Sequence, residues 1–188
     1  NDLGENRYMK RIKLTVAYDG TDYCGWQVQP NGVTIEEILN REISGLTGEE
    51  IRVIGASRTD SGVHALGNVA VFDTKCSIPA ERFAYALNRR MPEDIVIVRS
   101  EQVPDDWHPR RCDSRKTYEY RIYRAQFPMP VKRLYSLFTY YELDVNRMQE
   151  LRLIWRENMI SKASARPVPG GIQRTHHLFR GSGRAGRK

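Results

Sequence analysis

The chain has 188 residues, of which 40% are hydrophobic, enough for one large or two small globular domains. Its formal net charge is +7, but nine of the 30 basic residues and one of the 23 acidic residues follow Glu150. The preceding 150 residues therefore hold 21 basic and 22 acidic groups, so the overall charge does not indicate nucleic-acid binding by that part.

No apolar run is long enough to span a membrane, and the first residues, NDLGENRYMK, lack the apolar core of a signal peptide. The three cysteines, Cys24, Cys76 and Cys112, are odd in number and form no CxxC pair. This pattern argues against a disulfide framework or a zinc site, and we expect reduced thiols and a cytoplasmic protein.

Alternating hydrophobic residues predict a strand over 11–19, and Thr34 with Glu37 forms a T-x-x-E capping box. The apolar stripe after Thr34 predicts a helix that ends near Gly48. Further along the chain, the pattern predicts strands over 51–54, 68–73 and 95–98 and a second helix that begins at Pro79. The order is β-α-β-β-α-β, a ferredoxin-like unit in which both helices cover one face of an antiparallel sheet.

A second α/β unit is predicted to begin after Pro104. Residues 116–123 read as a strand with Tyr118, Tyr120 and Ile122 on one side, and 133–143 as a possible further strand. Asp144 is a candidate cap for a helix that starts near Val145.

The loop GASRTDSGVHALG, residues 55–67, carries Arg58 and Asp60 two positions apart between two predicted strands. A carboxylate beside a guanidinium stays ionised, and rigid strands direct it, as a nucleophilic or general-base aspartate requires. A salt-bridged turn without catalytic function uses the same residue types. From the loop alone, both interpretations stay open.

Basic and aromatic residues alternate between 110 and 124, which suits contacts to phosphates and stacking on bases. A solvated strand face explains the pattern equally well. The residues are Arg110, Arg111, Arg115, Lys116, Arg121, Arg124, Tyr118, Tyr120 and Tyr123.

About residues 10–150 resemble the TruA-type tRNA pseudouridine synthases. Four segments in order carry the resemblance: YDGTDYCGWQVQ (18–29), GASRTDSGVHALGNVA (55–70), ALNRRMPEDIVI (86–97) and WHPRRCDSRKTYEYRI (107–122). The resemblance implies the pseudouridine synthase fold, an α+β fold of two ferredoxin-like domains. It also implies isomerisation of uridine to pseudouridine in the anticodon stem-loop, positions 38–40, of tRNA by a homodimer without cofactor or metal.

By the same resemblance, Asp60 is the nucleophile, and Arg58 pairs with it and helps to hold the extruded nucleotide. Tyr118 matches the family tyrosine that packs on the flipped base, although a core role for this residue stays open. His64 is interpreted as a structural hydrogen-bond partner and Trp26 as a packing residue.

Three regions are therefore predicted: residues 8–104 as the domain with the Asp60 loop, 105–150 as a partial second α/β domain, and 151–188 as a disordered, family-unlike tail. Codons for residues 156–168 can be chosen so that a shifted reading frame encodes GEHDFKSFCSAR, a stretch similar to the family's continuation. We therefore expect a frameshift or truncation near Glu150, an incomplete second domain and impaired activity. A non-catalytic RNA-binding module and an inactive fragment are the alternatives.

Overall fold

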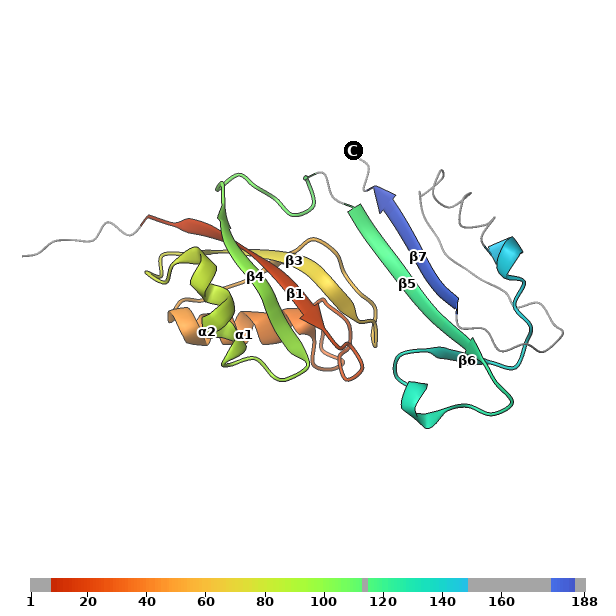
Figure 1. Cartoon of the computed structure of the whole chain (residues 1–188). Coiled ribbons are helices and arrows are strands. Elements are labelled where there is room, and N and C mark those ends of the chain that lie inside the picture. The colour runs from red at the N-terminus through yellow and green to blue at the C-terminus, as the bar shows by residue number, and fades with distance from the viewer. Residues whose placement is uncertain (1–7, 113–114, 149–176, 185–188) are drawn as a thin grey trace, which may run out of the picture. The chain divides into compact units, whose positions relative to one another are not determined.

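The computed structural model describes residues 8–112, 115–148 and 177–184, which belong to two compact units (Figure 1). The first unit spans Asn1–Cys112 and the second Asp113–Lys188. Each is described by itself below. Within the described ranges, no helix has the length and apolar character needed to cross a membrane.

The first unit contains a four-stranded antiparallel sheet with the strand order β2-β3-β1-β4. Its elements, in chain order, are β1 (Lys10–Tyr18), α1 (Ile35–Thr47), β2 (Ile54–Gly55), β3 (Ala65–Thr74), the 3-10 turn η1 (Ala80–Arg82), α2 (Phe83–Asn88) and β4 (Ile95–Val103). This β-α-β-β-α-β order and its central β1–β3 pair confirm the ferredoxin-like prediction.

The boundaries of α1 follow from local sequence. The Thr34 side chain accepts a hydrogen bond from Glu37 N at 3.3 Å, which satisfies one of the free backbone donors of the first turn. Gly48 ends the helix in the left-handed conformation, φ +74°, and its N–H donates to Ser44 O. The predicted cap residues are therefore the observed ones.

Both helices pack on one face of the sheet, where the alternating side chains of β1 meet them. Phe72 lies opposite Ile12 in the β1–β3 ladder and contacts Phe83 of α2 edge to face, with ring centroids 5.4 Å apart. The fully buried residues of this core include Ile12, Leu14, Val16, Ile35, Leu39, Ile43, Phe83 and Leu87.

The predicted strand over 51–54 is wrong at its start, since only Ile54 and Gly55 pair with β3. Ile51 and Val53 are buried, but their N–H groups donate to side chains of α1 at 2.9 and 2.8 Å. The acceptors are Ser44 Oγ and Asn40 Oδ1, so polar groups of the helix replace the ladder bonds at these positions.

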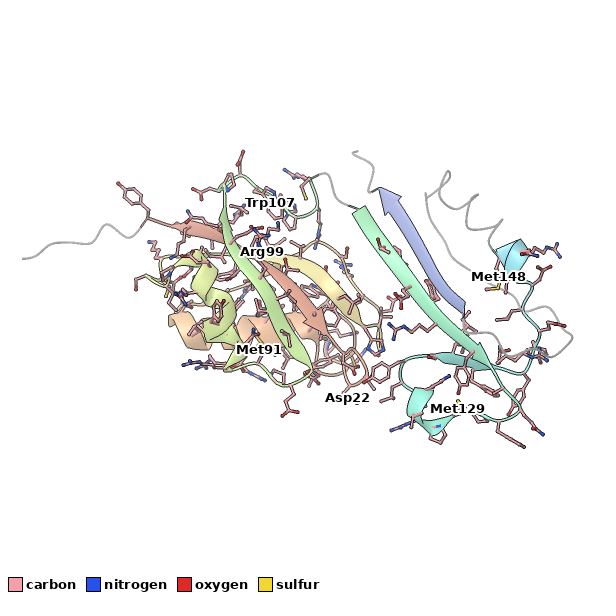
Figure 2. The ribbon with its side chains drawn as sticks, viewed as in Figure 1. Asp22, Met91, Arg99, Trp107, Met129 and Met148 are labelled. Carbon is pink, nitrogen blue, oxygen red and sulfur yellow. The ribbon has the colours of Figure 1, made fainter. Side chains whose placement is uncertain are left out.

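The first unit extends past residue 104, the predicted boundary, to Cys112. Arg11 joins this segment to the sheet, because its Nη1 donates to Trp107 O at 3.0 Å while its Nη2 pairs with Asp73 at 2.7 Å. Trp107 also lies beneath the Lys13 ammonium, 5.4 Å from the ring centroid. In Figure 2, Trp107 marks the connection that follows β4.

The second unit has a three-stranded sheet with the order β6-β5-β7. Its elements are β5 (Arg115–Arg124), the 3-10 turn η2 (Pro130–Lys132), β6 (Leu137–Thr139) and β7 (His177–Arg184). β6 runs parallel to β5 and β7 antiparallel to it. Asp144 caps the helical residues 145–148 as predicted, with its Oδ1 accepting from Arg147 N at 3.0 Å.

The expected disorder of the tail is wrong for His177–Arg184, which pair with β5 from Ile122 to Arg115. The backbone groups of a strand edge hydrogen-bond to almost any extended segment, so a family-unlike sequence does not prevent pairing. The remaining tail residues, including those of the proposed frameshift, lie outside the described residues.

Candidate active site

The loop with Arg58 and Asp60 connects β2 to β3 at one end of the first unit's sheet, where the sequence places it. The segment after β1, residues 19–29, lies against this loop; Figure 2 shows Asp22 in it. Trp26 N donates to Thr59 O at 3.0 Å, and Gly62 N donates to Tyr23 O at 3.2 Å. Backbone hydrogen bonds thus join two segments that lie far apart in the chain.

Two glycines permit this close approach. A Cβ added at Gly20 would overlap Val63 O, and one added at Gly25 would overlap Thr59 O. Gly25 also has φ +80°, a conformation that costs other residues free energy. The DGTDYCG stretch is therefore glycine-containing for a steric reason that concerns the Asp60 loop.

Side chains hold the loop from the sheet side. The hydroxyl of Tyr18, at the end of β1, lies 2.9 Å from Thr59 Oγ1, and the Tyr18 side chain is buried. Asn68 of β3 donates from Nδ2 to Ser57 O at 3.1 Å and lies 3.4 Å from the Tyr18 hydroxyl. Burial raises the pKa of Tyr18, so its hydroxyl stays protonated at neutral pH.

Asp60 begins a tight turn in which Val63 N donates to Asp60 O at 3.2 Å. Gly62 occupies the third position of this turn with φ +76°, as turns with a left-handed third residue require. Ser61 Oγ donates to Tyr23 O at 3.2 Å, which adds a bond just after Asp60. The backbone on both sides of the carboxylate is thereby fixed.

Arg58 and Asp60 share an open pocket with a volume of about 240 Å³. Both side chains are exposed, whereas Thr59 between them is half-buried. The pocket is lined by Cys24, Gln27, Val28, Gln29, Arg58, Thr59, Asp60 and Ser61. Its second wall comes from the segment after β1, which sequence reasoning did not assign to the site, although the motif YDGTDYCGWQVQ indicated that this segment matters.

The predicted Arg58–Asp60 ion pair is absent among the residues that the structure describes, where the ion pairs involve other groups. Backbone bonds and the Tyr18 hydroxyl hold the loop instead, and both charged side chains are exposed. The guanidinium and the carboxylate are therefore both available to a ligand in the pocket.

His64 and Trp26 have the structural roles that the sequence indicates. His64 Nδ1 accepts from Gly20 N at 3.1 Å and lies 2.9 Å from Asp19 Oδ1, so it joins the loop to the end of β1. Trp26 is 1% exposed and packs against Tyr18, with ring centroids 6.1 Å apart. A ring that is covered in this way is not available to stack on a base.

Arg110 contacts the base of the Asp60 loop, whereas the sequence indicated only its membership of the basic and aromatic cluster. Its Nε donates to Gly55 O at 2.9 Å, at the residue where β2 ends and the Asp60 loop begins. The Arg110 side chain thereby joins the segment after β4 to the base of the loop.

Tyr118 lies on β5 in the second unit and is 49% exposed, so it is not a core residue of the described structure. The core position on this strand is Tyr123, whose hydroxyl accepts from Met129 N at 2.8 Å. The predicted basic and aromatic cluster divides between the units, since Arg110 and Arg111 belong to the first. Arg58 and Asp60 line the same pocket of the first unit, whereas Tyr118 belongs to the second unit.

No group of three or more His, Cys, Asp or Glu side chains within the described ranges has the arrangement of a metal site. Cys24, Cys76 and Cys112 are all free thiols in the structure. The site thus consists of an exposed carboxylate and an exposed guanidinium, with amide and thiol side chains around them.

The ferredoxin-like sheet of the first unit agrees with the fold that the sequence resemblance implies, and comparison with known proteins supports the resemblance. A sequence model of the family described as tRNA pseudouridine synthase matches residues 14–110, which include the second half of β1 and the whole Asp60 loop. The chain belongs to the tRNA pseudouridine synthase family.

Several curated relatives are similar over most of the chain. It is 50% identical to tRNA pseudouridine synthase A of Acetivibrio thermocellus over 141 residues and 47% identical to that of a Thermoanaerobacter species over 142 residues. These matches cover 75% and 76% of this chain, which spans 58% of the length of either relative.

tRNA pseudouridine synthase A 2 of Clostridium perfringens is 44% identical over 167 residues, 89% of this chain and 68% of the relative. A match of that length within 188 residues must extend to residue 167 or further. It therefore enters the region after Glu150 that the sequence analysis set apart from the family.

Proposed function

We propose that this chain binds tRNA and isomerises uridine to pseudouridine, with Asp60 as the nucleophile. The observation that carries the proposal is the exposed Asp60 carboxylate in the 240 Å³ pocket, on a loop fixed by backbone bonds on both sides. The family relationship supports the substrate class, and a fixed but accessible carboxylate fits covalent catalysis.

The reaction moves the bond between ribose and base from a ring nitrogen to a ring carbon, with no net gain or loss of atoms. A base inside a stem must first leave its stack before any side chain reaches it. We propose the anticodon stem-loop as the target, as the resemblance implies. Asp60 then attacks either the sugar or the base, and the bond from the ribose to the ring nitrogen breaks. The new carbon–carbon bond forms, the carboxylate leaves, the ring carbon loses its proton to solvent and the freed nitrogen gains one.

Arg58 and Tyr118 complete the proposed site. Arg58 lines the same pocket as Asp60, and an exposed guanidinium binds phosphate with a planar pair of donors. Tyr118 has half of its side chain exposed, which leaves a ring face for stacking on the extruded base. We further propose that the chain acts in the cytosol and as a homodimer.

Exchange of Asp60 for Asn tests the proposal. Transfer RNA with tritium at the uracil C5 position releases the label when that carbon bonds to the ribose, so label release measures turnover. We expect Asp60→Asn to abolish release and to retain tRNA binding, because the amide keeps the shape of the carboxylate but is a poor nucleophile. Asp22→Asn, an exposed aspartate in the neighbouring segment, is the matched control and should retain turnover.

The alternative is an RNA-binding module, in which the wild-type chain binds tRNA without release and Asp60→Asn changes nothing. The same assay measures the impaired activity that we expect from the atypical tail. If the wild-type chain turns over as fast as a full-length relative, that expectation is wrong, and the genomic DNA across the Glu150 codon tests the frameshift directly.

A further inference from the structure

A partly buried hydrogen-bond network lies directly beneath the Asp60 loop. It consists of Tyr18 on β1, Asn68 on β3 and Thr59 in the loop, with distances of 3.4 Å from Asn68 Nδ2 to the Tyr18 hydroxyl and 2.9 Å from that hydroxyl to Thr59 Oγ1. Tyr18 is 4% exposed and packs against Trp26. We call these three residues the Tyr18 network.

The direction of each bond follows from its partners. Asn68 Oδ1 accepts from Val69 N at 3.0 Å, and its Nδ2 donates to Ser57 O, which has no proton to give. The amide orientation is therefore fixed, and the second Nδ2 proton points to the Tyr18 hydroxyl oxygen. The hydroxyl proton of Tyr18 then remains for Thr59 Oγ1.

This network fixes the one residue that separates the two functional side chains. Thr59 is held by its side chain toward Tyr18 and by its carbonyl toward Trp26 N. Its neighbours Arg58 and Asp60 are both exposed and both line the pocket. A rotation of Thr59 would displace both of them.

We propose that Tyr18 and Thr59, supported by Asn68, are positioning residues for Asp60 in the reaction proposed above, on which this inference rests. The Tyr18 hydroxyl does not touch the substrate; it holds Thr59 so that the Asp60 carboxylate faces the reacting atom. A catalytic group must be held within about 0.5 Å of its productive position. Loss of one hydrogen bond of the Tyr18 network should therefore lower turnover more than tRNA binding.

Four variants of the full chain test the network. Tyr18→Phe and Thr59→Val each remove one hydroxyl and keep the shape of the side chain, and we expect each to lower kcat about tenfold with KM unchanged. The double variant should be no slower than the slower single variant, because both remove the same bond. Thr59→Ser keeps the hydroxyl and should retain the wild-type kcat.

Tyr85→Phe is the matched control, since Tyr85 on α2 is 70% exposed and lies outside the pocket. It should change neither kcat nor KM. Rates are compared well below the lowest melting temperature of the set, so that global unfolding does not contribute. Additive losses in the double variant, a change in KM alone, or no rescue by Thr59→Ser would overturn the proposal.

Hydrogen–deuterium exchange gives a readout that does not need turnover. In Tyr18→Phe and Thr59→Val, peptides from residues 57–63 should exchange about tenfold faster, while peptides from α1 stay at the wild-type rate. Unchanged exchange in the loop overturns the proposal, as does faster exchange with unchanged kcat. If the wild-type chain releases no tritium, the proposed function fails, and the exchange result alone then decides whether the network fixes the loop.

Discussion

Substitution of Gly25 by Ala tests whether the segment after β1 supports the Asp60 loop. Gly25 has φ +80°, and an added Cβ would overlap Thr59 O. Gly48, at the end of α1, has nearly the same φ of +74°, but a Cβ there has nothing within 4 Å. The two substitutions therefore share the backbone cost and differ only in the contact with the loop.

The expected magnitudes follow from that difference. A non-glycine residue in the left-handed conformation costs about 1–2 kcal/mol, which is the whole expected effect of Gly48→Ala. In Gly25→Ala, Thr59 O must also move away from its 3.0 Å bond to Trp26 N, whose buried N–H then lacks a partner at a further cost of about 1–3 kcal/mol. We expect a total loss of roughly 2–5 kcal/mol for Gly25→Ala.

Urea unfolding followed by tryptophan fluorescence measures both free energies of unfolding, because Trp26 and Trp107 lie in the first unit. Turnover is measured beside it, and only Gly25→Ala should lower kcat. Equal losses of stability in the two variants, together with unchanged kcat, would refute the idea that the close approach at Gly25 supports the loop.

Three further predictions concern the first unit. Leu39→Ala should lower the free energy of unfolding by about 2–5 kcal/mol, because this fully buried side chain leaves a cavity between α1 and the sheet. Asn40→Ala should cost about 1–3 kcal/mol in the same urea assay, since it removes the acceptor of the buried Val53 N–H. The hydrogen bond from Lys13 lowers the pKa of Glu101 below its ordinary 4.5, so the stability it contributes is present above that pH and is lost as pH falls through the lowered pKa. Thermal melting from pH 7 to pH 3 should therefore show a smaller acid destabilisation in Glu101→Gln than in the wild-type chain.

Periodicity and capping were sufficient to predict most of the first unit. Alternation along β1, the Thr34 cap and Gly48 are local features, and each has the predicted role in the structure. The prediction of a strand over residues 51–54 was wrong at its start for a reason that is not local. The N–H groups of this segment bond to Asn40 and Ser44 on the preceding helix, and an apolar run alone does not show which acceptors will face it.

The prediction of disorder for the tail was wrong at His177–Arg184 for a related reason. Composition rich in Gly, Pro, Ser and Arg predicts disorder when a segment is considered alone. β5 offers an open edge, and the backbone of His177–Arg184 satisfies it from Ile122 to Arg115. Pairing of this kind depends on the neighbouring strand rather than on the side chains of the segment, so composition did not predict it.

The candidate site also combines a local feature that the sequence predicts with contacts to distant residues that it does not. The sequence located Asp60 correctly on the β2–β3 loop, but it assigned the support of the carboxylate to Arg58, two residues away. In the structure, the support comes from Tyr18 and Asn68 on the sheet and from the glycine-containing segment after β1. Because the bonds from Trp26 to Thr59 and from Tyr18 to Thr59 join residues 33 and 41 positions apart, the YDGTDYCGW and RTDSGVH motifs form a single structural unit. Loss of one of these contacts, on either motif, should therefore alter the position of the carboxylate, even where the substituted residue lies outside the pocket.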